Sequence, residues 1–131
     1  MCVNLKKSDD LEEFNIELYK SRADIIRQTV AQVEKDFGMF GIPVMFTGNT
    51  EMAYAEMFSQ LNIHISDLLQ HNFGKLSALL YQIDLGEDKI VEAGREHSDW
   101  GLPEVITELV IHRELKKVLL RNYFKNQKSG E

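Results

Sequence analysis

The sequence predicts an all-α protein, a bundle of four or five helices with one irregular apolar segment at about residues 38–49. Apolar residues recur at steps of three and four, the spacing of an apolar stripe on a helix, in three parts of the chain. The central stripe comprises Tyr54, Phe58, Leu61, Ile65 and Leu68 and, after a one-residue phase shift, Phe73, Leu76, Leu80 and Ile83. No repeat or linker divides the 131 residues. We therefore expect a single helical domain over 1–131, with frayed ends at 1–8 and 126–131.

The first helix is expected from Asp9 to Phe37. Asp9 and Glu12 fit a capping box, and Gly38 suits the position after the last turn. One broad apolar face is formed by Leu11, Phe14, Leu18, Ile25, Ile26, Val30, Val33 and Phe37. A helix of this length spans about 43 Å, which favours a bundle backbone or a dimer arm.

The segment at 38–49 is apolar but contains glycines and Pro43, which exclude a helix interior. Within it, Ile42–Phe46 suits a short extended piece. One interpretation is a connection packed over the end of the bundle. The other is a Met/Phe surface for a partner, because methionine adapts to irregular shapes. The candidate partner-binding residues here are Met39, Phe40, Met45 and Phe46.

The second helix should begin around Asn49 or Thr50. We expect a break or kink at residues 72–74, since Asn and Gly tolerate the left-handed conformation. The alternative is one continuous helix through Ile83, because a single interior glycine costs only about 1 kcal/mol. Asp84 and Glu87 resemble a second capping box that would open a short helix ending near residues 94–97.

A turn containing Trp100 then leads to the last helix, at whose first position we place Pro103. We expect Trp100 to anchor this turn onto the bundle. The last helix carries the apolar residues Ile106, Leu109, Val110, Leu119, Leu120, Tyr123 and Phe124.

The charge distribution separates an acidic body from a basic last helix. The formal net charge is −6, yet six cations and only one carboxylate lie between residues 111 and 128. Arg113, Lys117, Arg121 and Lys125 recur every four residues and predict a positive face. Such a face suits solvent, an acidic protein partner or a phosphate backbone. The acidic remainder and the lack of a nucleic-acid-binding motif argue against nucleic acid.

The most metal-like cluster consists of His64, Asp67 and His71, with Glu56 and Gln60 upstream on the same side of the helix. The two histidines are separated by about 10.5 Å along a helix axis, too far to share one ion easily. We therefore expect no metal site and no cofactor. No nucleophile elbow, phosphate-binding glycine loop or facing carboxylate pair indicates an enzyme.

The chain has one cysteine, Cys2, so it has no intrachain disulfide, and this suits a reducing compartment. It contains no apolar run of membrane-spanning length and no recognisable secretory signal. These features predict a cytoplasmic protein without a membrane partner.

The leading functional prediction is a non-enzymatic protein–protein interaction module, homodimeric or a subunit of a larger assembly. It would dock through the 38–49 segment and make charge-guided contacts through Arg113, Lys117 and Arg121. The acidic start of the first helix could also meet the basic last helix, either within one chain by antiparallel packing or across a dimer. The alternatives are a bundle with a ligand or metal pocket, as in a small enzyme or sensor, and a weak nucleic-acid binder.

Overall fold

The computed structural model describes the backbone of residues 8–129 and the side chains of residues 22–125. Five helices and no strand are found over residues 8–129, which confirms the all-α prediction. The helices are α1 (Ser8–Gly38), α2 (Ala53–His71), α3 (Phe73–Ile83), α4 (Glu87–Glu96) and α5 (Leu102–Ser129). Cys2 and the side chains of the predicted first capping box lie outside the described residues.

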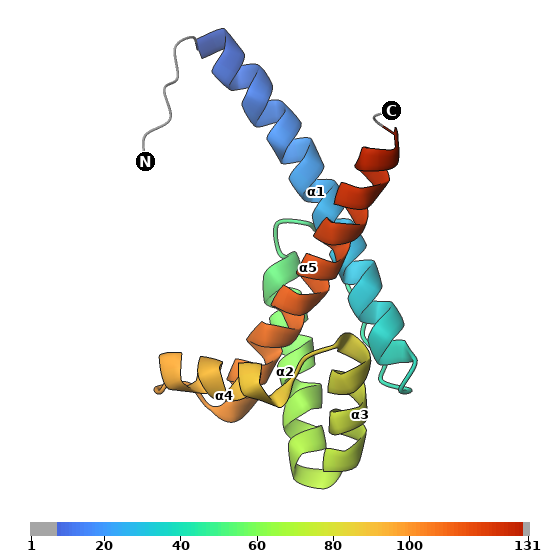
Figure 1. The fold of residues 1–131 in the computed structure, drawn as a ribbon, viewed down its shortest axis with the longest axis vertical. Helices are drawn as coiled ribbons and strands as arrows, with labels where there is room; N and C mark the ends of the chain where they lie inside the picture. Colours follow the sequence, from blue (N-terminus) through green and yellow to red (C-terminus); the bar gives the residue numbers. More distant parts are fainter. Residues whose placement is uncertain (1–7, 130–131) are drawn as a thin grey trace.

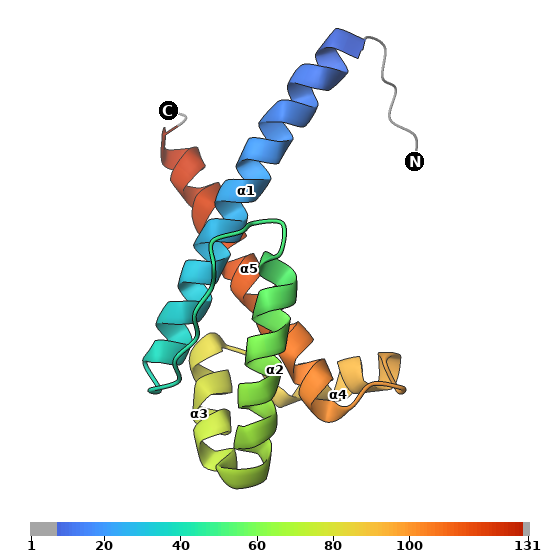
Figure 2. The same cartoon turned by 180° about the vertical axis from the view of Figure 1, so that it is seen from behind.

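Helix α5 is the centre of the fold, because it contacts each of the other four helices. Figure 1 shows α1 crossing α5, with α2 and α3 forming a helical hairpin below and α4 projecting from the base. Figure 2 shows the same crossing from behind. In both views the N-terminal part of α1 and the C-terminal part of α5 extend beyond the other helices and separate from each other.

The hydrophobic core lies below the crossing, where α1, α2, α3 and α5 meet. It contains Val33, Phe37, Ile42, Val44, Met57, Leu61, Ile65, Leu68, Leu76, Leu79, Leu80, Ile83, Ile106, Val110 and Ile111. Thr29 is a polar residue within the apolar face of α1. It can be buried there because its hydroxyl donates to the carbonyl of Ile25 at 2.8 Å.

The buried row of α2 is shifted by one residue from the expected stripe. Ala53 and Met57 are buried, whereas Tyr54 is exposed and Phe58 is only partly buried. Beyond Leu61 the expected and observed rows coincide at Ile65 and Leu68. Helix α2 begins later than predicted, at Ala53. Asn49 accepts from the N–H of Glu51 within a turn instead of capping the helix.

The predicted break falls at Asn72, for a different reason than expected. Asn72 has an extended φ of −155°, and its side chain accepts from the N–H of Lys75 at 3.1 Å. It therefore ends α2 and caps the N-terminus of α3 without adopting a left-handed conformation.

The predicted capping box at Asp84 and Glu87 is wrong. Asp84 ends α3 in the left-handed region, with φ of 67°, and Gly86 occupies the N-cap of α4 without a side-chain bond. The carboxylate of Asp84 instead accepts from Arg113 at 3.2 Å. The end of α4 at Glu96 agrees with the prediction.

Candidate functional site

The connection between α1 and α2 runs along α2 and is held there by three polar side chains. The carboxamide of Gln60 bonds both the N–H and the C=O of Met45, with the N–H contact at 3.0 Å. Glu56 accepts from the N–H and the hydroxyl of Thr47, at 3.2 and 2.6 Å. His64 donates from Nε2 to the carbonyl of Pro43 at 3.1 Å. We call Glu56, Gln60 and His64 the α2 clamp.

The α2 clamp works because two periodicities match. Residues four apart on a helix are separated by about 6 Å. Residues two apart in an extended chain are separated by about 6.6 Å. The clamp positions therefore meet every second residue of the connection, which leaves Ile42 and Val44 to point into the core.

The four candidate partner-binding residues of the 38–49 segment divide into two pairs. Phe40 and Phe46 are partly buried and pack against the core. Met39 and Met45 are 58% and 79% exposed. The segment is thus extended around residues 42–47, with a packed side and an open side.

The metal candidates have separate contacts. His64 belongs to the α2 clamp, whereas His71 Nδ1 lies 3.0 Å from Asp67 Oδ1 in an exposed pair. No group of three or more His, Cys, Asp or Glu side chains is arranged for a metal ion within the described part of the chain.

The basic candidates of α5 all contact their own chain. Arg113 donates to the Ile83 carbonyl at 3.1 Å as well as to Asp84. Lys117 Nζ lies 2.7 Å from Asp36 Oδ2, and Arg121 donates to Gln32 at 2.9 Å.

A ladder of polar pairs therefore joins α1 to α5. Gln32 donates to Asp36 at 3.1 Å, and Asn122 donates to Gln28 at 2.8 Å. The rungs ascend α1 as they descend α5, so the two helices are antiparallel. We call this set of pairs, from Gln28–Asn122 to Asp36–Lys117, the polar seam.

A buried charge cluster closes the polar seam at its lower end. Glu114 is fully buried, and its Oε1 lies 3.0 Å from Lys117 Nζ. Burial and a hydrogen bond shared with Asp36 raise the pKa of Glu114 to about 8. Burial would also raise the pKa of Asp36, but its bonds with Glu114, Lys117 and Gln32 outweigh this and lower it.

With a pKa of about 8, Glu114 is mainly protonated at neutral pH, with Asp36 and Lys117 beside it. Among the described residues, neither carboxyl oxygen of Glu114 has a hydrogen-bond partner with ordinary geometry. Burial would lower the pKa of Lys117, yet its bonds to the two carboxyls raise it, so the lysine stays charged. The two carboxyl groups, Glu114 and Asp36, therefore share one proton beside the charged Lys117.

The C-terminal half of α5 has the opposite orientation to the one expected. Its polar side faces α1 through the polar seam, whereas Leu119, Leu120, Tyr123 and Phe124 are between 44% and 63% exposed. The rings of Tyr123 and Phe124 are in edge contact, with centroids 5.3 Å apart. We call these four residues the α5 patch.

Sequence reasoning missed the α5 patch because it grouped these residues with the other apolar residues of the last helix, such as Ile106 and Val110, which are buried. The available signal was the row of polar residues on the other side of the same helix. An exposed apolar patch on the order of 400 Å² has the size of the largest patch on an ordinary monomer, and such patches are often functional.

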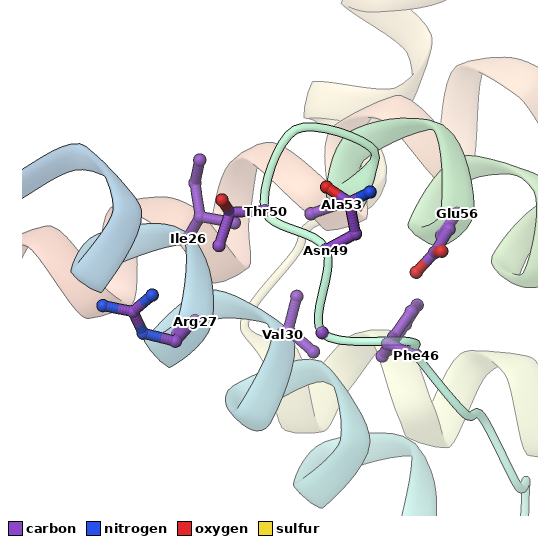
Figure 3. A pocket seen from close by; sticks show the side chains of 9 residues that line it. Ile26, Arg27, Val30, Phe46, Asn49, Thr50, Ala53 and Glu56 are labelled. Carbon is purple, nitrogen blue, oxygen red and sulfur yellow. The ribbon is translucent and has the colours of Figure 1, made fainter. Parts of the chain in front are cut away.

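A small cavity lies where α1, the connection and α2 meet (Figure 3). Ile26 and Val30 line it from α1, Phe46 from the connection and Ala53 from α2. Its volume of about 70 Å³ is far below the several hundred Å³ of ligand pockets. We therefore regard it as a packing gap.

A larger apolar groove of about 540 Å³ lies between α3, α4 and α5. Leu76 and Leu80 form its floor on α3, and Ile90 and Val91 face it from α4. Since α4 buries no residue fully, this wall is weakly attached. We call this cavity the α4 groove.

Trp100 stacks on His97 with ring centroids 4.0 Å apart and remains 38% exposed. The indole and Phe58 border an open depression with Asp99 and Glu104. The stacked pair lies within the turn before α5, so the predicted anchoring of Trp100 onto the bundle stays a prediction.

A contact that the sequence did not predict joins α2 to α5 at the surface. The hydroxyl of Tyr54 donates to Glu108, whose other oxygen lies 2.7 Å from Nε2 of His112. Partial desolvation of the hydroxyl, followed by the bond to Glu108, raises the pKa of Tyr54 to about 12. The phenol therefore remains protonated and acts as a donor that ties the two helices together.

None of the helices over the described residues has the length and apolarity that crossing a membrane requires. No protein-family model, curated protein or solved structure matches this chain, so the surfaces described above are the basis for its functional proposal.

Proposed function

We propose that this protein is a non-enzymatic protein–protein interaction module that docks through the α5 patch. The observation that supports this proposal is the orientation of α5 beyond Val118. A helix that pairs its polar side with a neighbour and leaves its apolar side to water needs a further partner to bury that side.

The proposal replaces the docking mode expected from the sequence. Arg113, Lys117 and Arg121 have contacts within the chain, so we do not assign them to the docking surface. The exposed Met39 and Met45 remain a secondary candidate surface on another side of the fold.

The test uses a photo-crosslinking phenylalanine analogue at Phe124, with the same analogue at the exposed Glu92 of α4 as the matched control. Light scattering after size exclusion gives the mass of the purified protein. A module predicts a defined protein adduct at position 124 and none at position 92. A monomer that forms no adduct in lysate or with itself would overturn the proposal.

The α4 groove supports a second candidate, a bundle that binds a small apolar ligand. Its volume lies within the range of ligand pockets, and Ser77 and Tyr81 add hydroxyls at its edge. Native mass spectrometry of the purified protein, compared with Leu80→Trp, tests this function. A bound small molecule lost in the variant would support it, and the same spectrum for both proteins would exclude it.

A further inference from the structure

The N-terminal part of α1 lies near the α5 patch but does not cover it within the same chain. Both views show the N-terminal turns of α1 continuing past the crossing and separating from α5 (Figures 1 and 2). The polar seam turns the opposite side of α5 toward α1. Within one chain, α1 therefore does not cover the patch.

The first turns of α1 have the sequence of an element that needs a partner. Leu11, Leu18, Ile25 and Gln32 recur every seven residues, and Gln32 lies on the side of α1 that faces α5. Between residues 11 and 25 this row contains the apolar Leu11, Phe14, Leu18 and Ile25, interrupted by Ser21 and Arg22. The backbone of α1 that carries this row continues above the crossing, where α5 has separated from it.

The charges of the two surfaces are complementary. Residues 9–17 contain five carboxylates, whereas Lys116 lies one turn before Leu119 and Leu120 on the patch side of α5. Lys128 follows Phe124 by one turn. An acidic amphipathic helix therefore fits a basic apolar patch in both polarity and charge.

The area also fits a reciprocal exchange. One patch of about 400 Å² covers a similar area of the helix that lies on it. Two such contacts bury about 1,600 Å² in total, the size of a standard stable interface. A contact made twice by the same two surfaces closes around a two-fold axis.

We infer that the partner of the α5 patch is a second copy of this chain, whose α1 residues 8–20 lie on the patch, with the exchange made reciprocally. This inference rests on the proposed function and names its partner. The α1 arm of each protomer and the patch of the other form one composite surface.

Complementary charge reversal tests the inference. The first variant carries Asp10→Lys, Glu13→Lys and Glu17→Lys, and the second carries Lys116→Glu and Lys128→Glu. None of these positions belongs to the polar seam. We expect the wild type to have a dimer mass by light scattering and each variant alone to have a monomer mass. An equal mixture should recover a heterodimer, because both contacts again pair opposite charges.

Two controls accompany this measurement. Glu92→Lys reverses a charge on exposed α4 and should leave the dimer unchanged. Circular dichroism and thermal unfolding establish that each variant is folded, and the analogue at Phe124 gives an independent readout. When protein carrying the photo-crosslinking analogue at position 124 is mixed with unlabelled wild type, the crosslink should map to residues 8–20 of the unlabelled copy.

Three outcomes would overturn the inference. A wild-type dimer that survives both charge variants would show that α1 is not the occupant. A patch adduct that maps elsewhere on the second copy would show the same. A monomer whose patch crosslinks to a different protein would reject self-association while leaving the proposed function intact.

Discussion

The carboxamide of Gln60 bonds both backbone groups of Met45, as a neighbouring β-strand would. A helix side chain thereby satisfies an extended segment that has no sheet partner among the described residues. Glu56 and His64 repeat the arrangement one turn before and one turn after. The connection is fixed by one row of α2 rather than by hydrophobic contact alone.

Gln60→Ala should lower the free energy of unfolding by about 1 kcal/mol and accelerate hydrogen exchange of the Met45 amide. Gln60→Glu should retain protection of that amide, because it still accepts, while losing the bond to the Met45 carbonyl. Exchange mass spectrometry with urea titration measures both. Ser59→Ala, at an exposed neighbouring position, is the control, and equal exchange in Gln60→Ala and Ser59→Ala would contradict the clamp.

The pKa of Glu114 predicts an unusual dependence of stability on pH. Its value of about 8 in the folded chain exceeds the ordinary 4.5, so the folded protein holds a proton that the unfolded chain releases. This contribution is fully present below the unfolded pKa and is lost as the pH rises through the folded pKa. The lowered pKa of Asp36 acts in the opposite direction, and only in acid.

Glu114→Gln should therefore flatten the loss of stability between about pH 5 and 8, and at pH 8 should stabilise the protein by roughly 2 kcal/mol. The amide keeps a donor for Asp36 and carries no charge. Urea unfolding across the pH range measures the slope. Glu92→Gln, on exposed α4, should leave the slope unchanged, and a parallel slope in Glu114→Gln would refute the protonated cluster.

The break between α2 and α3 depends on Asn72 rather than on Gly74. Asn72→Ala should cost about 1 kcal/mol, because the N–H of Lys75 loses its cap, and Asn72→Asp should keep most of the stability. Gly74→Ala should instead stabilise α3 by about 0.5–1 kcal/mol, since the added methyl meets only Asn72 Oδ1 at 3.9 Å. Thermal unfolding compares the three variants. Destabilisation by Gly74→Ala would mean that the glycine sets the break.

The position of Asp84 is tested by comparing two substitutions. Both remove its exposed bond to Arg113, which contributes little. Only glycine relieves the left-handed backbone, so Asp84→Gly should be about 1 kcal/mol more stable than Asp84→Ala. Equal stability of the two variants in urea would indicate that the backbone at this position carries no strain.

The helical fold and the breaks between helices were predictable because the apolar rows are long and because Gly, Pro and Asn residues mark the ends of the helices. The row on α2 was misplaced by one residue because Tyr54 and Phe58 repeat at the same spacing as Ala53 and Met57. Periodicity cannot choose between two adjacent apolar rows. Packing against α5 makes that choice.

The larger error, in the C-terminal half of α5, has a different cause. A single helix cannot show that Lys117 will meet Asp36, or that Arg121 will meet Gln32. These pairings join residues more than 80 positions apart and make a polar helix side the buried one. The candidate site followed from this reversal, so it was beyond what periodicity within one helix reveals.

Because α5 contacts every other helix, the core is incomplete until the last of the five helices has been synthesised. Val33, Leu61 and Leu79 belong to helices that are synthesised before α5, and α5 completes the core that shields them from water. A nascent chain on the ribosome would expose these side chains until α5 had emerged. The growing chain therefore needs protection of these side chains from non-specific association until α5 is available.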